Sequence, residues 1–299
     1  MNSNLKVHFV LALVSLLFAI NYTVAKIVMP NYMDPLALIA LRVPSATILF
    51  WAFHYFFGTL KTAPAFKDLG RFLAAAVFGV AINQIFFFKG ISLTSPMLGS
   101  VIMTSTPIVV LVISFFVLNE KITWFKSIGL LLGASGALLL ITSTGIDFSN
   151  ATFLGNLFIL TNAISYSIYL VIIKPLMAKY DALTVIKWVF LFGSFMVIPF
   201  GFNNLQSIEW GQFNYTIWTS IAYIIIGPTF LAYLLNLWSL KKVNPSLVGY
   251  YIYLQPLFAT TIAVIFRGDV LSFNTLIFSI MIFGGVFMVS YTRSKPLNS

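Results

Sequence analysis

The sequence predicts an all-α integral membrane protein with ten transmembrane helices, arranged as two inverted five-helix repeats. Three observations lead to this fold class. The 299 residues are 60% hydrophobic and only 8% charged, whereas a soluble domain is about 25% charged. Residues 90–137 reappear at residues 239–286 with a constant offset of 149, which pairs Pro107 with Pro256. The basic residues are distributed unevenly between the two sides that the apolar stretches define.

Ten apolar stretches are each long enough to cross a bilayer as a helix, which takes about 20 residues. We expect these spans at residues 7–28, 35–57, 69–91, 95–118, 124–142, 152–173, 183–203, 216–239, 245–266 and 272–291. Barrel strands are excluded because they alternate in polarity over about ten residues. Asn21 and Lys26 lie where a signal peptide would be cleaved, so the first span is expected to be retained.

The direction of the spans follows from the lysines and arginines. With the N-terminus in the cytoplasm, 13 of these 17 residues fall on the cytoplasmic side, and three (Lys26, Lys89 and Arg267) fall outside. The positive-inside rule therefore predicts that both termini are cytoplasmic, which requires an even number of spans. Each repeat has five, an odd number, so the second repeat enters from the opposite face. We expect the repeats to occupy residues 1–147 and 148–299.

Several function classes conflict with the composition. The chain has no cysteine, so thiolate metal sites and a cysteine nucleophile are excluded. Its net charge of +10 comes from scattered residues rather than a basic stripe, so no nucleic-acid partner is expected. No glycine-rich phosphate loop is present. We predict no metal, no cofactor and no catalytic residue.

The acidic residues lie at or near the ends of predicted spans. They are Asp34, Asp68, Glu120, Asp147, Asp181, Glu209 and Asp269. A buried carboxylate is what a proton-driven pump of cationic drugs needs, so that type of antiporter is disfavoured. A membrane-embedded enzyme acting on lipid or isoprenoid would need converging acidic or histidine groups, so it remains only a minor alternative.

Amides, hydroxyls and phenols within the spans are the candidate substrate contacts. Several share a helix face, because residues three and four apart are neighbours; Asn162, Tyr166 and Tyr169 are one such set. Such a lining suits a neutral or zwitterionic organic solute. The alternative is that these groups only bond one helix to another. The predicted contacts are Asn21, Asn83, Gln84, Thr104, Tyr166, Tyr169, Tyr233, Asn236, Tyr250 and Tyr253.

Two prolines and two cations complete the predicted site. Pro107 and Pro256 occupy equivalent positions, and each removes a backbone hydrogen bond. They are candidate hinges, with static kinks as the alternative. Arg42 and Lys89 could contact an anion, although cations near a span end more often extend towards the interface.

The ordered set of motifs resembles the EamA-like transporters of the drug/metabolite transporter superfamily. The resemblance rests on Asn21-Tyr22-Thr23-Val24-Ala25-Lys26, Arg42, Gly90-Ile91-Ser92-Leu93-Thr94-Ser95-Pro96, Thr106-Pro107, Glu120-Lys121, Ser165-Tyr166-Ser167-Ile168-Tyr169, Asn244-Pro245, Gln255-Pro256 and Gly284-Gly285. Arg267-Gly268-Asp269 departs from the first-half Leu118-Asn119-Glu120. The resemblance implies a carrier of small metabolites in a bacterial inner membrane, with a central cavity lined by both halves and with spans five and ten peripheral.

We therefore expect a secondary transporter that exports a small organic metabolite such as an amino acid by alternating access. A nucleotide-sugar or phosphorylated-metabolite carrier is the alternative, and it would need Lys26, Arg42 or Lys89 to face the cavity. A further alternative is a scaffold or receptor that transports nothing, in which the matched prolines Pro107 and Pro256 would have no function as hinges. Gly129, Gly133 and Ala137 form a stripe of small residues. This stripe suits packing within the chain or a homodimer through span five or ten.

Overall fold

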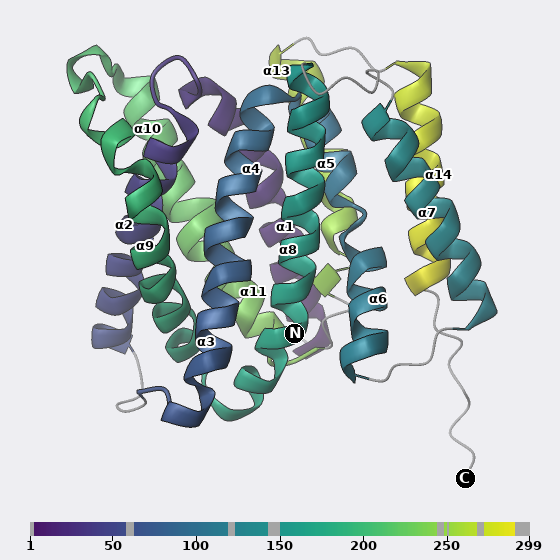
Figure 1. Cartoon of the computed structure of the whole chain (residues 1–299), viewed down its shortest axis with the longest axis horizontal. Coiled ribbons are helices and arrows are strands. Elements are labelled where there is room, and N and C mark those ends of the chain that lie inside the picture. The colour runs from purple at the N-terminus through teal and green to yellow at the C-terminus, as the bar shows by residue number, and fades with distance from the viewer. Residues whose placement is uncertain are drawn as a thin grey trace.

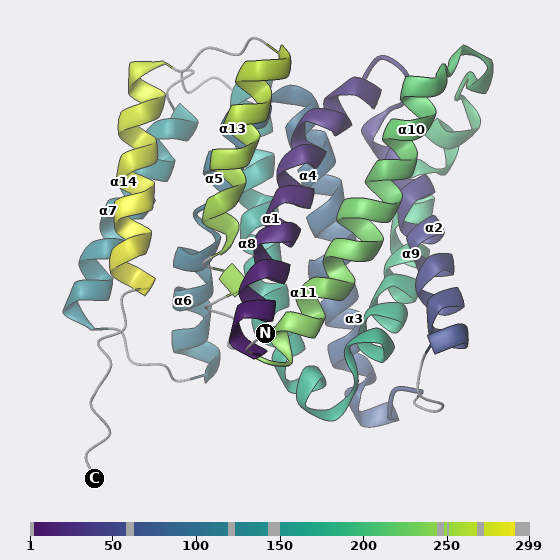
Figure 2. The same cartoon turned by 180° about the vertical axis from the view of Figure 1, so that it is seen from behind.

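Every regular element in the described part of the chain is a helix. The computed structural model describes residues 3–57, 63–118, 123–142, 150–243, 248–249, 251–267 and 272–290. The helices run roughly side by side (Figures 1 and 2). The start of α3 and the ends of α6 and α8 lie towards the lower end in Figure 1, whereas the start of α10 and the end of α13 lie at the upper end.

The elements follow the predicted spans closely in both halves, apart from residues 245–247 and 250 of the predicted ninth span, which lie outside the described residues. In the first half they are α1 (Ser3–Val28), α2 (Pro35–Phe57), η1 (Phe66–Asp68), α3 (Leu69–Ala76), η2 (Val77–Ala81), α4 (Ile82–Leu93), α5 (Pro96–Met103), α6 (Thr106–Leu118) and α7 (Trp124–Thr142). In the second half they are α8 (Ala151–Lys179), α9 (Ala182–Gln206), η3 (Trp210–Gln212), α10 (Tyr215–Ile224), η4 (Ile225–Leu231), α11 (Ala232–Leu240), η5 (Tyr251–Tyr253), α13 (Leu254–Arg267) and α14 (Phe273–Ser290).

The chain is a multi-pass membrane protein. Seven helical segments of the described residues are long and apolar enough to cross a bilayer: Lys6–Val28, Pro35–Phe57, Phe66–Leu93, Pro96–Val117, Ala151–Lys179, Ala182–Gln206 and Tyr215–Leu240. Helices α7, α13 and α14 occupy the other three predicted ranges. Large apolar side chains such as Phe56, Phe195 and Phe266 are well exposed on the outside. Many exposed large apolar side chains of this kind suit contact with lipid.

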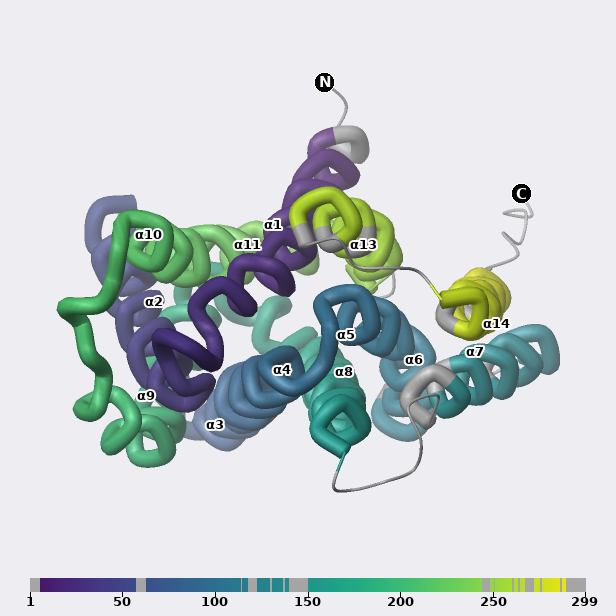
Figure 3. The backbone as a smooth tube through the Cα atoms, turned by 90° about the horizontal axis from the view of Figure 1, so that it is seen from above, coloured from purple at the N-terminus to yellow at the C-terminus, as the bar shows by residue number. Residues whose placement is uncertain are grey.

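Two pairs of helices pack in antiparallel fashion. In α2 and α9, Thr47 Oγ1 lies 2.8 Å from Ser194 Oγ, and the ring of Phe50 lies 5.0 Å from that of Phe190. Residue numbers rise along one helix as they fall along the other. In α7 and α14, Gly133 contacts Gly285, whereas Gly136 contacts Ile282. This second pair stands to one side of the other helices (Figure 3).

Each of two long helices contains a π-helical segment, namely η2 and η4. In η4, Pro228 has no amide hydrogen, which favours an irregular turn. In η2, Gly79 lets the Tyr169 ring pack directly on the backbone, because a side chain on Gly79 would overlap that ring. Single π turns inside α-helices are frequent at functional sites.

The predicted fourth span is broken between α5 and α6, just before Pro107. Three hydroxyl groups satisfy the carbonyl oxygens at the break, since each donates to the carbonyl three residues earlier. The bonds are Thr104 Oγ1 to Val101 O at 2.6 Å, Ser105 Oγ to Ile102 O at 2.7 Å and Thr106 Oγ1 to Met103 O at 2.7 Å. Buried carbonyl groups in a membrane need such partners.

Substitution of Thr106 by valine is expected to destabilise the protein by about 1 kcal/mol. Valine keeps the shape of threonine but leaves Met103 O without its hydroxyl donor. Melting temperature of the purified protein in detergent measures the effect. Thr106→Ser keeps the donor and should melt within a degree or two of the unaltered protein. Equal melting of both variants would mean that the hydroxyl does not support the break.

The second half has an irregular turn at the corresponding place. Residues Tyr251–Tyr253 form a 3₁₀ turn, and α13 then begins at Leu254, so Pro256 lies in its first turn, where proline is tolerated. Pro107 lies likewise in the first turn of α6. Ser15 Oγ of α1 donates to Tyr251 O at 2.6 Å. The two prolines therefore begin new helix segments rather than kink continuous ones.

Candidate functional site

A polar cavity lies at the centre of the helices, with a volume of about 50 Å³, which is room for a few water molecules. Both halves of the chain contribute to it. From residues 1–147 the lining residues are Phe18, Asn21, Tyr22, Arg42, Asn83, Gln84, Phe87 and Met103, and from residues 148–299 they are Asn162, Tyr166, Tyr233, Ile252 and Gln255.

Tyr233 of α11 is the centre of a buried hydrogen-bond network. Its hydroxyl lies 3.2 Å from Asn83 Oδ1 and 3.3 Å from Gly79 O, which are both acceptors. The hydroxyl hydrogen must therefore point towards one of them, and Gln84 Nε2 donates to the phenol oxygen at 2.6 Å. The network joins α4 and η2 to α11, and it fixes the orientation of both amides.

Asn162 of α8 has a defined orientation as well. Its Nδ2 donates to the backbone oxygen of Asn83 at 2.7 Å. Because that partner can only accept, the other side-chain atom is the amide oxygen. This Oδ1 atom and Asn21 Oδ1 are both buried, and neither has a hydrogen-bond partner among the described residues. The cavity wall therefore contains two acceptors that need a donor.

Tyr166 connects the cavity to residues behind it. Asn236 Nδ2 lies 2.6 Å from its hydroxyl. The Tyr169 ring stacks on the Tyr166 ring, with centroids 5.9 Å apart. Tyr169 and Asn236 therefore support Tyr166 from behind and do not line the cavity themselves.

One of the described residues that line the cavity is charged, namely Arg42 of α2. Only 2% of its surface is exposed. Its Nε donates to Thr229 Oγ1 at 2.9 Å, and Nη2 also donates to that oxygen. Thr229 in turn donates to Ile224 O at 2.5 Å. The guanidinium carbon lies 4.4 Å above the centre of the Phe88 ring.

The structure separates the predicted contacts into two groups. Asn21, Asn83, Gln84, Tyr166 and Tyr233 line the cavity, and so does Arg42. Thr104 is fully buried at the break, Tyr169 and Asn236 lie behind Tyr166, Tyr253 packs against Phe283, and Lys89 is not among the described lining residues. Tyr250 lies outside the described residues.

The other lining residues were not on the list of predicted contacts. Tyr22 OH donates to Gln255 Oε1 at 3.3 Å, and the Phe87 ring packs edge-on against Tyr22 with centroids 5.2 Å apart. Tyr22 and Gln255 belong to the motifs quoted above, and Asn162 shares the face of Tyr166, so a signal for these three existed. Apolar lining residues such as Phe18 gave no signal, since apolar residues occur on every face of these helices.

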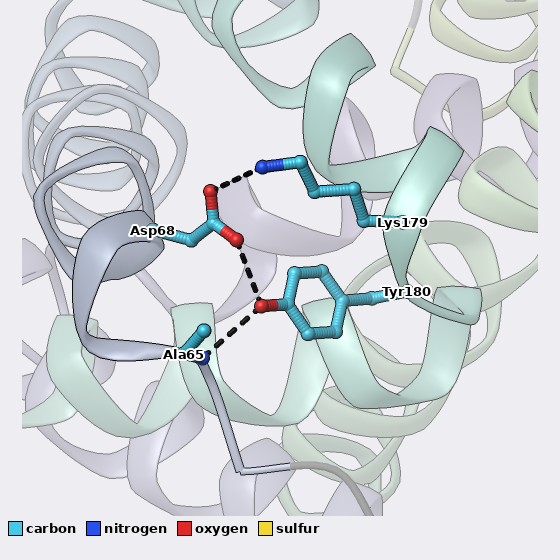
Figure 4. Close-up of polar contacts among 4 residues, drawn as sticks. All are labelled: Ala65, Asp68, Lys179 and Tyr180. Carbon is cyan, nitrogen blue, oxygen red and sulfur yellow. Dashed lines mark hydrogen bonds and ion pairs between the residues drawn. The ribbon is translucent and has the colours of Figure 1, made fainter.

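A polar link joins the start of α3 to the end of α8 (Figure 4). Both of these helix ends lie towards the lower end of the molecule in Figure 1. Lys179 Nζ at the end of α8 lies 2.6 Å from Asp68 Oδ1, just before α3. Tyr180 OH donates to Asp68 Oδ2 at 2.9 Å, and the amide of Ala65 donates to Tyr180 OH at 3.1 Å. The carboxylate of Asp68 thus binds two consecutive residues of the second half.

The arrangement is suited to binding a solute. The described residues contain no cluster of histidine or acidic side chains that could hold a metal ion. The cavity offers amide and phenol groups for hydrogen bonds, one guanidinium group and several aromatic rings. Such a mixture fixes the orientation of a small amphipathic molecule and covers its apolar part.

Comparisons with known proteins agree with this description. The model of the EamA-like transporter family matches residues 5–142 and, separately, residues 153–291. An uncharacterized transporter of Archaeoglobus fulgidus is 26% identical over 284 residues, which is 95% of this chain and 98% of that protein. The WAT1-related protein At3g18200 of Arabidopsis thaliana is 25% identical and covers 97% of this chain and 83% of its own.

The fold has also been observed in a solved structure. A crystal structure at 18% sequence identity superposes with a TM-score of 0.65, covering 94% of this chain and 98% of the other. At this level of identity the likeness concerns the fold alone.

Proposed function

The chain belongs to the EamA-like transporter family, and we propose that this membrane transporter, which is not an enzyme, is a ten-span secondary transporter. It would move a small organic metabolite such as an amino acid outward by alternating access. Its two inverted halves would be residues 1–147 and 148–299. The observation that carries the proposal is the polar cavity, to which both halves contribute side chains.

Several matched positions support the inverted repeat. Gln84 and Tyr233 are separated by the repeat offset of 149, and they are hydrogen-bonded to each other. The segments η2 and η4 lie at equivalent places in the two halves. The antiparallel pairs α2 with α9 and α7 with α14 are pairs of equivalent spans. Equivalent spans in antiparallel contact are what an inverted repeat around a two-fold axis would produce.

The two helix breaks are suited to motion during transport. Each has a lining residue near a proline in the first turn of a helix: Met103 lies four residues before Pro107, and Gln255 lies immediately before Pro256. A rotation at either break would move cavity residues without disturbing a continuous hydrogen-bond ladder. Pro107 and Pro256 would in this way serve as the hinges of alternating access.

Neutralising Asp68 is expected to open the lower end of the transporter. Asp68→Asn removes the ion pair with Lys179, so the state in which α3 and α8 separate becomes more populated. Because the sequence contains no cysteine, a single cysteine in place of the buried Met177 reports this opening. Maleimide labelling should accelerate about threefold, a modest effect because Lys179 is partly exposed to solvent.

Lys179→Gln should have the same effect, since it removes the same ion pair. Asp34→Asn provides a matched control, because Asp34 bonds to the backbone of Leu36 at the start of α2 instead. Unchanged labelling in both Asp68→Asn and Lys179→Gln would show that the link does not restrain this end.

The proposed location is a bacterial inner membrane with both termini in the cytoplasm. The link between Asp68 and Lys179 would then lie at the cytoplasmic end. Lys67, Arg71 and Lys174 lie near the same end, in agreement with the positive-inside rule. Fusion of a reporter enzyme to either terminus, assayed on both sides of the membrane, tests this orientation.

Metabolite profiling tests the function directly. Medium from cells that produce the protein is compared with medium from cells that lack it, and solutes enriched at least threefold are then tested in proteoliposomes. The proposal expects at least one small organic solute to move down its gradient through the purified protein. If none of the enriched small organic solutes moves through the purified protein, the proposed function is wrong.

A further inference from the structure

The guanidinium group of Arg42 has more donors than the protein satisfies. Arginine has five N–H donors. In the described part of the chain, the hydroxyl oxygen of Thr229 accepts from Nε and Nη2, and no other hydrogen-bond partner is present. The single hydroxyl hydrogen of Thr229 is donated to Ile224 O, so the hydroxyl oxygen acts only as an acceptor for Arg42. The remaining donors of Arg42 are therefore free to bind a ligand.

The charge of Arg42 is also unbalanced within the described residues. The ion pair found among the described residues joins Lys179 to Asp68 and does not involve Arg42. It connects the end of α8 to the start of α3, at the lower end of the molecule in Figure 1. No described acidic residue lines the cavity. The ring of Phe88 lies against the guanidinium group and offsets part of the cost of burial. A buried cation without a counter-ion is costly, so a ligand that supplies a negative charge would bind strongly here.

We propose that the transported solute is an organic monocarboxylate whose carboxylate pairs with Arg42. This inference rests on the proposed function and narrows its solute from small metabolites in general to organic anions. A carboxylate can accept two parallel hydrogen bonds from one guanidinium group, and such pairs are among the strongest in proteins. Arg42 is thereby a residue that determines specificity for charge.

The rest of the wall indicates what the solute carries besides its carboxylate. The buried oxygens of Asn21 and Asn162 need a hydrogen-bond donor. A hydroxyl or N–H group on the solute would supply one. Phe18, Tyr22 and Phe87 offer ring faces and edges to an apolar body. In chemistry, these groups match a small aromatic or branched acid with one donor group near its carboxylate, and the cavity of about 50 Å³ must widen to admit it.

The charge of the solute distinguishes monocarboxylates from zwitterions and from phosphate dianions. A zwitterion would bring its ammonium group into a cavity that already contains the Arg42 cation, with no acidic side chain among the described lining residues. A phosphate dianion would call for more than one cation. Lys26 is instead bonded to Ser92 O at 2.9 Å, and Lys89 is not among the described lining residues. One guanidinium group matches one carboxylate.

Binding of matched aromatic probes to the full-length protein in detergent tests the inference. The probes share a benzene ring and differ in charge: 3-phenyllactate, phenylalanine, phenethylamine and phenyl phosphate. Equilibrium dialysis should show 3-phenyllactate binding at least tenfold more tightly than phenylalanine or phenyl phosphate, and phenethylamine binding most weakly. Arg42→Gln should weaken binding of 3-phenyllactate at least tenfold, and it should strengthen binding of phenethylamine, whose ammonium group no longer meets the Arg42 cation. Arg42→Lys should be intermediate.

Two further variants keep the test decisive if Arg42→Gln fails to fold. Thr229→Val removes the internal acceptor, so Arg42 should bind 3-phenyllactate more tightly, by about twofold or more. Lys89→Gln removes a matched cation outside the cavity lining and should change nothing. Tightest binding of phenylalanine or phenyl phosphate would overturn the inference, as would unchanged binding of 3-phenyllactate in Arg42→Gln or weaker binding in Thr229→Val.

Transport assays in proteoliposomes distinguish a failure of this inference from a failure of the proposed function on which it rests. Proteoliposomes that move phenylalanine without preferring 3-phenyllactate would retain the transporter and overturn the choice of an anion. Proteoliposomes that move no solute, although 3-phenyllactate binds through Arg42, would contradict the proposed function and leave the binding site in place.

Discussion

Tyr233→Phe is expected to lose at least nine-tenths of transport activity while the protein still folds. The variant removes a hydroxyl that accepts from Gln84 Nε2 and donates to either Asn83 Oδ1 or Gly79 O. The buried amide groups of Gln84 and Asn83 would both lose a partner. An unsatisfied buried group costs about 1–3 kcal/mol, so both amides would rotate to find new partners and the cavity wall would change.

The matched control for this variant lies on the same long helical segment. Tyr223→Phe removes a phenol that donates to Leu17 O at 2.9 Å, outside the described cavity lining. It should lose a similar amount of stability but little transport. Initial rates in proteoliposomes, normalised to the amount of folded protein, give the comparison. Equal loss in the two variants would show that the Tyr233 network supports only the fold.

The position of each helix was predictable from the sequence because membrane spans are long and apolar. The ranges 35–57 and 124–142 agree with α2 and α7 to the residue. The π turns within the spans were not predicted, although Pro228 in η4 favours an irregular turn. The segments η2 and η4 are as apolar as the α-helix around them, since lipid demands apolar residues whatever the turn. Both segments lie inside predicted spans that contain no other interruption.

The π turns explain in part why the spacing of the polar residues did not predict the cavity lining in full. A regular α-helix places residues three and four apart on one face, so Asn162, Tyr166 and Tyr169 were expected to share a lining. Tyr169 instead packs on the backbone of Gly79, which the irregular segment η2 brings close. Its ring therefore supports Tyr166 from behind. Asn162 and Tyr166 line the cavity, whereas Tyr169 does not, because a neighbouring helix lies against it.

Thr104 shows a second reason why polar residues in a span are ambiguous. A hydroxyl can face a solute, or it can satisfy its own backbone where a proline interrupts the helix. The sequence shows the proline at Pro107 and three hydroxyl residues before it. The structure uses Thr104, Ser105 and Thr106 to satisfy carbonyl oxygens. Hydroxyl residues in the turn before a span proline are better first assigned to the backbone.

Gly285→Ala is expected to destabilise the pairing of α7 with α14 by about 2–3 kcal/mol. A Cβ atom on Gly285 would lie 2.5 Å from Gly129 O and 2.6 Å from Gly133 Cα. Both obstacles are backbone atoms, which cannot rotate away as a side chain would. The two helices would have to separate, and their close contact along the small-residue stripe would be lost.

The adjacent glycine provides the control. A Cβ atom on Gly284 meets nothing closer than Leu132 Cδ2, at 3.6 Å, so Gly284→Ala should melt like the unaltered protein. Melting temperature in detergent, together with the mass of the complex, distinguishes packing within the chain from a homodimer through the same stripe. Packing within the chain predicts a lower melting temperature at every protein concentration. If Gly285→Ala instead changed only the mass of the complex, the stripe would serve a second copy of the chain.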